Sequence, residues 1–167
     1  LCMDLTRFDV DLESMTDGEI EEHLRDLHRH LNTVQGRIVA ATRAFDRRTI
    51  YALDGARTTA GWLTARIDQT RSQCGRDVDL GRTLETMPIV DAAFQAGRIG
   101  RAKADLLAQT RTPEIAAVFA EQEDWLVAEV ADLRVCDANR FLRAWHQQAR
   151  LHVGSIDPDE AVTETAP

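Results

Sequence analysis

The feature of the sequence that most constrains the fold is an apolar heptad stripe near its N-terminus. Apolar side chains recur there at alternating intervals of four and three residues, at Ile20, Leu24, Leu27, Leu31, Val34, Ile38, Ala41 and Phe45. This spacing places them on one side of a helix of about seven turns. Thr16 and Glu19 have the spacing of a capping box, which predicts that the helix begins directly after Thr16.

A helix of this length with one apolar seam requires a partner helix, and the sequence leaves two sources open. In the first, the helix lies across its own domain and the partner comes from the same chain. In the second, two copies of the protein pair through the seam. The interface of that homodimer would consist of Leu24, Leu27, Leu31, Val34 and Ile38.

The rest of the chain also favours helices. Aromatic residues make up only 5% of the sequence, and no stretch has the two-residue alternation of a strand. Helical spacing and start signals predict further helices over 60–67, 70–87 and 88–96, and others that begin near Arg101, Thr112 and Asp137. The predicted fold class is therefore all-α: a multi-helix bundle with one long N-terminal heptad helix and short central helix–turn–helix-like units. The predicted domain covers 1–153, and 154–167 is expected to be a tail or linker.

Several helix ends carry residues with a defined backbone role. Thr70 and Gln73 have the spacing of a second capping box. Pro88 is expected at the first position of a helix, and Thr112 is expected to cap the helix that follows it. Gly97 lies where a helix would end with a residue in the left-handed conformation. These signals predict short, sharply separated helices in the centre of the chain.

The charge of the chain is unevenly distributed. The whole sequence has a net charge of −8, whereas residues 57–103 contain eight Lys or Arg and five Asp or Glu, a local net charge of +3. A basic centre between acidic flanks is typical of a small surface that binds anions or nucleic acid. The overall acidity argues against a protein that coats nucleic acid indiscriminately.

Two helix pairs in this basic centre, residues 58–103, have the proportions of a helix–turn–helix motif. The first joins 60–67 to the helix from Thr70, and the second joins 92–96 to the helix that contains Arg101. DNA is therefore the expected partner, with contacts from the residues Arg71, Gln73, Arg76, Arg66, Arg82, Arg98, Arg101 and Lys103. The alternative is that these are ordinary helix pairs with solvent-exposed arginines.

The sequence offers no constellation for catalysis, and neither a metal ion nor a cofactor is expected. None of the five histidines has a second histidine four residues away, and no C-x-x-C motif accompanies them. The carboxylates of Glu121, Glu123 and Asp124 are expected to face solvent on an acidic helix rim rather than to act as acid and base.

The cysteines and the hydropathy pattern favour a cytoplasmic protein. The three cysteines are far apart, which is typical of reduced thiols rather than of a disulfide framework. No apolar run approaches the roughly 20 residues that span a bilayer. We therefore expect no contact with a membrane.

Four short motifs in a fixed order resemble those of one protein family. They are AGWLTAR at 60–66, RTLETMP at 82–88, AAFQAGRI at 92–99 and DPD at 157–159. Together they resemble the 13E12 repeat family of actinobacteria, a domain of unknown function usually found in front of an HNH endonuclease module. The resemblance covers most of the chain, from Thr16 to Asp159. Gly100 departs from the pattern, since the family has a small hydroxylated residue there, and Glu160 replaces the glycine that closes the last motif.

The resemblance implies a non-catalytic helical domain that binds or positions DNA for an HNH nuclease, in mobile-element or phage-like transactions. The family's domain has no established catalytic residues to transfer to this sequence. The HNH residues themselves are absent, so nuclease activity is expected only from a module that follows the linker at 154–167. The alternative function is a protein-interaction or dimerisation module that uses the heptad helix without nucleic acid.

Overall fold

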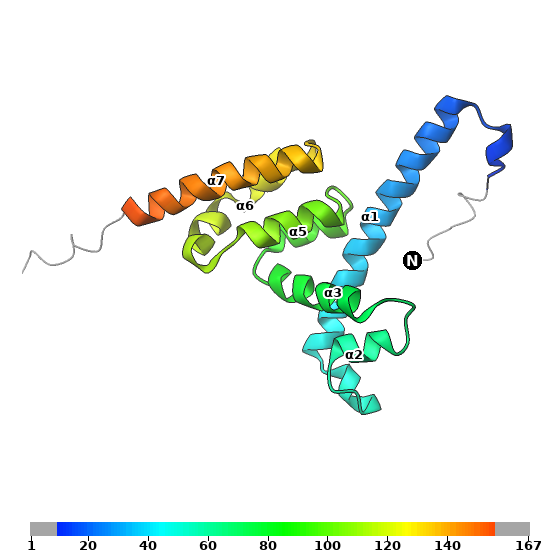
Figure 1. The fold of residues 1–167 in the computed structure, drawn as a ribbon, viewed down its shortest axis with the longest axis horizontal. Coiled ribbons are helices and arrows are strands. Elements are labelled where there is room, and N and C mark those ends of the chain that lie inside the picture. The colour runs from blue at the N-terminus through cyan, green and yellow to red at the C-terminus, as the bar shows by residue number, and fades with distance from the viewer. Residues whose placement is uncertain (1–9, 156–167) are drawn as a thin grey trace, which may run out of the picture.

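The computed structural model describes residues 10–155, which form seven α-helices (Figure 1). In chain order these are α1 (Asp17–Arg47), α2 (Thr59–Thr64), α3 (Arg71–Leu84), α4 (Pro88–Gln95), α5 (Arg101–Thr110), α6 (Ala116–Ala131) and α7 (Val135–Ser155). Short 3-10 turns lie at Leu12–Ser14, Ile50–Asp54 and Pro113–Ile115. The predicted all-α class is confirmed, including the long N-terminal helix. No helix in the range 10–155 is long and apolar enough to cross a bilayer.

Local backbone chemistry determines most of the helix ends. Thr16 accepts a hydrogen bond from the amide of Glu19, and the Glu19 carboxylate accepts one from the amide of Thr16 at 2.8 Å. This capping box confirms the predicted start of α1, and Thr70 closes the second predicted box at the start of α3. Gly97 has a φ of 74°, the left-handed conformation predicted for it.

Three details differ from the sequence-based expectation. The helix predicted over 60–67 ends at Thr64, so Ile67 lies in the turn beyond it and is 45% exposed. The side chain of Thr112 makes no capping hydrogen bond, since a 3-10 turn precedes α6. Helix α7 continues through Gly154, where the linker was expected to begin. The remainder of that linker and the DPD motif lie outside the described residues.

Helices α3 to α7 enclose the hydrophobic core. Its largest fully buried side chains include Phe94, Phe119, Leu84, Met87, Ile99 and Leu107. The ring of Phe119 meets the ring of Trp145 edge-on, with the centroids 5.7 Å apart. Helices α5 and α7 lie side by side, and α4 packs against α6. This arrangement makes one body from the central and C-terminal helices.

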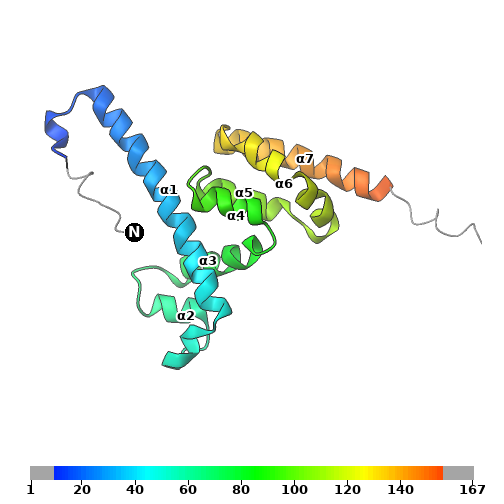
Figure 2. The same cartoon turned by 180° about the vertical axis from the view of Figure 1, so that it is seen from behind.

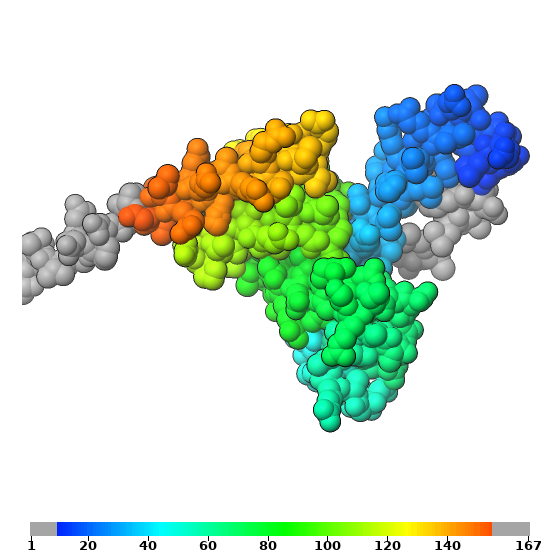
Figure 3. Space-filling model, in the orientation of Figure 1, coloured from blue at the N-terminus to red at the C-terminus, as the bar shows by residue number. Residues whose placement is uncertain are grey.

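Helix α1 attaches to this body through small residues in its C-terminal half. Gly36, Val39 and Thr42 are the buried residues of α1. At Gly36 the helix crosses α4 so closely that a Cβ atom would lie 2.4 Å from the carbonyl oxygen of Phe94. The N-terminal half of α1 continues past the body and stands apart from it (Figure 1, Figure 2 and Figure 3). The face that packs on the body is therefore not the face that carries the heptad stripe.

Candidate functional site

The heptad seam of α1 is largely uncovered. Five of its apolar side chains are between 37% and 54% exposed, namely Ile20, Leu24, Leu27, Leu31 and Ile38. Toward the end of the seam, the ring of Phe45 packs on that of Trp62 in α2, with the centroids 4.6 Å apart. Helix α2 of the same chain therefore covers the C-terminal end of the seam. Within the described residues, no helix packs on the N-terminal half of the seam.

The structure divides the eight residues predicted to contact DNA into two groups. Arg71, Arg76 and Arg98 are exposed, the first two on α3 and the third in the turn before α5. Gln73 is exposed as well, but its side-chain oxygen accepts hydrogen bonds from the amide and the hydroxyl of Thr70. Gln73 therefore caps α3. The three arginines of this group are exposed, and Arg76 also donates to the hydroxyl of Ser72 in its own helix at 2.8 Å.

Arg66 and Arg82 belong to the second group, whose side chains are engaged within the protein. Arg82 donates from Nε to the Asp46 carboxylate at 2.8 Å. Arg66 pairs with Asp54 at 3.1 Å, and its guanidinium carbon lies 4.6 Å from the centre of the Trp62 ring. These contacts hold α2 and α3 against the last turns of α1 and the 3-10 turn that follows it.

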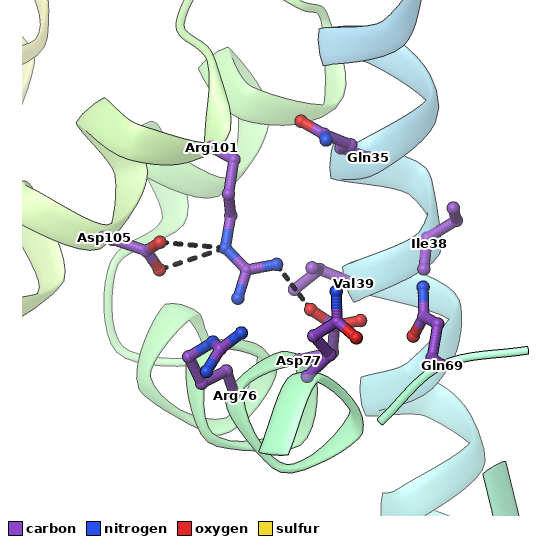
Figure 4. A pocket seen from close by; sticks show the side chains of 9 residues that line it. Gln35, Ile38, Val39, Gln69, Arg76, Asp77, Arg101 and Asp105 are labelled. Atoms are coloured by element: carbon purple, nitrogen blue, oxygen red, sulfur yellow. Dashed lines mark hydrogen bonds and ion pairs between the residues drawn. The ribbon is translucent and has the colours of Figure 1, made fainter. Parts of the chain in front are cut away.

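Arg101 and Lys103 are half-buried and connect helices. Arg101 forms ion pairs with Asp77 and Asp105 (Figure 4). Burial disfavours its charged form, but the hydrogen bond to Asp77 and the charge of Asp105 outweigh this and raise the pKa of Arg101. The Lys103 ammonium donates to the carbonyl of Ala131, and burial lowers the pKa of Lys103. Both side chains therefore form contacts within the protein.

A small polar pocket surrounds Arg101 between α1, α3 and α5 (Figure 4). Its volume is about 240 Å³, and the amide of Gln35 forms part of its wall. The two arginines in its wall, Arg76 and Arg101, are matched by the two aspartates Asp77 and Asp105. An anion would therefore gain little from the electrostatics of this pocket.

The ion pair between Asp46 and Arg82 predicts a pH-dependent contribution to stability. The hydrogen bonds from Arg82 lower the pKa of Asp46, and the hydroxyl of the buried Thr59 donates to the same carboxylate at 2.6 Å. Asp46→Asn is expected to reduce the free energy of unfolding by about 1 kcal/mol at neutral pH, because Arg82 is mostly exposed and its attraction is screened.

The sign of the pH effect follows from the lowered pKa. The stability that ionised Asp46 contributes is present above its ordinary pKa of 3.8 and is lost as the pH falls through the lower folded value. Urea titrations should therefore show a difference between wild type and Asp46→Asn that is constant near neutral pH and shrinks below about pH 4. Asp68→Asn, in the exposed turn before α3, serves as the control, and an equal effect of both changes would contradict this account.

Glu123 is a structural residue, and the prediction that it faces solvent is wrong. Its side chain is 3% exposed. One carboxylate oxygen accepts hydrogen bonds from the backbone amides of Ile89 at 2.9 Å and Val90 at 2.8 Å. Met87, at the N-cap position of α4, provides no capping side chain. Glu123 in α6 therefore caps α4 from a distant part of the chain, while Glu121 and Asp124 are exposed as expected.

A basic groove between α5 and α7 was not predicted from the sequence. The groove has a volume of about 390 Å³ and an apolar floor that includes Leu106. Arg143, His146 and Arg150 of α7 line it, and among the described residues that form its wall there is no carboxylate. Their intervals of three and four residues place these three side chains on one side of the helix. This hollow has two arginines in its wall, one of which, Arg150, pairs with Glu114 outside the wall.

Comparison of the chain with protein-family models, with curated proteins and with solved structures gives no match in any of the three. Within residues 10–155, no group of three or more His, Cys, Asp or Glu side chains converges on a point that could hold a metal ion. The arrangement of side chains is therefore the basis for any assignment of function.

Proposed function

We propose that this chain is a non-catalytic helical association module, in which the uncovered seam of α1 pairs with the seam of a second copy. The exposure of Ile20, Leu24, Leu27 and Leu31 carries this proposal. A contiguous row of large apolar side chains in water is costly, and burial of the exposed half of each gains roughly 1 kcal/mol. A helix-mediated pair would cover the row along its length.

The spacing of the seam supports a helix as the partner. Intervals of four and three residues are those at which side chains of two helices interlock in a coiled coil. The N-terminal half of α1 projects beyond the body (Figure 3), and its seam side chains Leu24, Leu27 and Leu31 are exposed over two turns. Because the body attaches to α1 on a different face, at Gly36 and Val39, pairing through the seam does not displace it.

The edges of the seam support a second copy as the source of that helix. In an antiparallel pair with Leu24 of one copy against Leu27 of the other, Glu21 of each copy lies beside His28 of the other. Both side chains are exposed, and Glu21 pairs with Arg25 of its own helix. The seam is therefore complementary to itself in both its apolar row and one of its flanks.

The seam variant Leu24→Asp with Leu31→Asp is expected to abolish pairing, because it places four carboxylates in the dimer interface. Light scattering should give a molar mass near the 18.7 kDa of one chain for the variant, and a larger, concentration-dependent mass for the wild type. The free energy of unfolding of the monomer should change little, since both side chains are exposed in it.

The chain offers a matched control for this experiment. Leu53 and Leu151 are 85% and 74% exposed and lie outside the seam. Leu53→Asp with Leu151→Asp adds the same charge and removes the same apolar groups, yet should leave the molar mass of the wild type unchanged. An equal loss of association in both double variants would show that pairing does not depend on the seam.

The role in positioning DNA for a nuclease module stays a prediction. Of the residues expected to serve it, the exposed arginines Arg71, Arg76 and Arg98 remain available. A module that pairs through α1 would present two such sets to one duplex, which is how dimeric helix–turn–helix proteins gain affinity.

A further inference from the structure

We propose that the groove between α5 and α7 binds the phosphate backbone of single-stranded nucleic acid, with Arg143 and Arg150 as the phosphate contacts. The two helices lie side by side (Figure 1). Side chains of both helices line the groove. This site is separate from the seam of α1, so the inference does not depend on pairing between copies.

The charge of the groove is the first argument. Two guanidinium groups and the imidazole of His146 line it, whereas the pocket at Arg101 has an aspartate for every arginine. In a chain of net charge −8, a hollow whose wall carries two arginines and no carboxylate is a favourable place for a polyanion. Arg143 is also exposed, so its guanidinium is accessible to a ligand.

The spacing along α7 favours a chain of linked phosphates over a single small anion. Arg143 and Arg150 are seven residues apart, which corresponds to about 10 Å along the helix axis. Linked phosphates in one strand could contact both arginines at once, whereas a lone phosphate would favour one of them. The groove, at about 390 Å³, can hold a few nucleotides of a flexible single strand but is too small to enclose a rigid duplex.

The other side chains of the groove support a nucleic acid rather than another polyanion. Gln109, Asn139 and Gln147 add amide donors and acceptors beside the arginines. Amides of this kind bind sugar hydroxyls and the edges of unpaired bases. The apolar floor, which includes Leu142, provides contact for the remaining surface of a nucleotide.

An ion pair within the chain provides a second, independent test of whether Arg150 binds phosphate. Arg150 donates to the carboxylate of Glu114 at 3.0 Å, and both side chains are about 60% exposed. A phosphate that binds Arg150 has to compete with this carboxylate. Removal of the Glu114 charge should therefore strengthen binding, an effect that a purely structural ion pair would not produce.

The test is fluorescence anisotropy of the intact chain with a labelled, mixed-sequence single strand of about 12 nucleotides at low salt. Arg143→Gln with Arg150→Gln should weaken binding at least about tenfold and make the slope of log affinity against log salt shallower by about 1.4, or 0.7 for each lost phosphate contact. Glu114→Gln should strengthen binding about threefold.

Arg37→Gln with Arg47→Gln is the matched control, because it removes the same charge from exposed positions on α1 that are not among the predicted DNA contacts. It should change the affinity less than about twofold. A loss equal to that of the groove variant would overturn the proposal, as would the absence of binding by the wild type at low salt. Tighter binding of the corresponding duplex than of the single strand would overturn the assignment of the ligand. Circular dichroism of each variant verifies that the helices are intact.

Discussion

Replacement of Glu123 with alanine is expected to reduce the free energy of unfolding by about 3 kcal/mol. The carboxylate accepts hydrogen bonds from the amides of Ile89 and Val90 in the first turn of α4, where no other side chain caps the helix. Its removal leaves one buried and one half-buried donor without this partner and takes a negative charge away from the positive end of the helix dipole. Unfolding in urea, monitored by circular dichroism, measures the loss.

The neighbours of Glu123 provide the control for this prediction. Glu121→Ala and Asp124→Ala remove carboxylates from exposed positions of the same helix, and each should change the free energy of unfolding by less than about 0.5 kcal/mol. Glu123→Gln keeps an oxygen that can accept both bonds, so it should fall between wild type and Glu123→Ala. A Glu123→Ala variant as stable as Glu121→Ala would refute the capping role.

Gly36→Ala is expected to destabilise the protein by about 3 kcal/mol, although alanine favours a helix by about 1 kcal/mol over glycine. A Cβ atom at Gly36 would lie 2.4 Å from the carbonyl oxygen and 2.6 Å from the carbonyl carbon of Phe94. Both atoms belong to the backbone of α4, so α1 and α4 would have to separate. Thermal unfolding should show a decrease in Tm of roughly 3 °C for each kcal/mol.

Gly75 in α3 is the matched control, because it is also inside a helix but has open space where its Cβ would be. Beyond the backbone of its own helix, no atom lies within 4 Å of that position. Gly75→Ala should therefore stabilise the protein, by about 0.5 to 1 kcal/mol. The two substitutions are chemically identical and should have opposite signs. If Gly36→Ala also raised Tm, the close crossing of α1 and α4 would be excluded.

Much of the fold could be predicted because its signals are local. The capping boxes at Thr16 and Thr70, the proline that opens α4 and the left-handed Gly97 all depend on residues within one turn of each other. The apolar periodicity of α3 and α7 likewise depends on one helix at a time. Sequence alone therefore located the helices and the buried side of most of them.

The functional surfaces could not be predicted in the same way, because they depend on contacts between distant segments. Glu123 resembles its acidic neighbours in sequence, and only the approach of α4 makes it a cap. Arg101 contributed to the positive charge of the basic segment. In the fold, Asp77 of α3 and Asp105 of its own helix form ion pairs with it and offset this charge.

The basic groove was missed because it lies in a part of the sequence that is acidic overall. Residues 104–167 contain five Lys or Arg against twelve Asp or Glu, so a count along the chain indicates an acidic region. The interval of seven residues between Arg143 and Arg150 was the signal available, since it puts both on one side of a helix. A count of charge on each helix face, rather than along each segment, would have indicated this basic surface.

Sedimentation equilibrium of the unmodified chain over a range of dilutions tests the pairing of α1 most directly. We expect a reversible change from the 18.7 kDa monomer to a species of twice that mass as the concentration rises to about 0.1 mM. The Leu24→Asp, Leu31→Asp variant should sediment as the monomer throughout. A wild-type chain that remains monomeric at that concentration would contradict the central claim that two copies pair through the seam of α1.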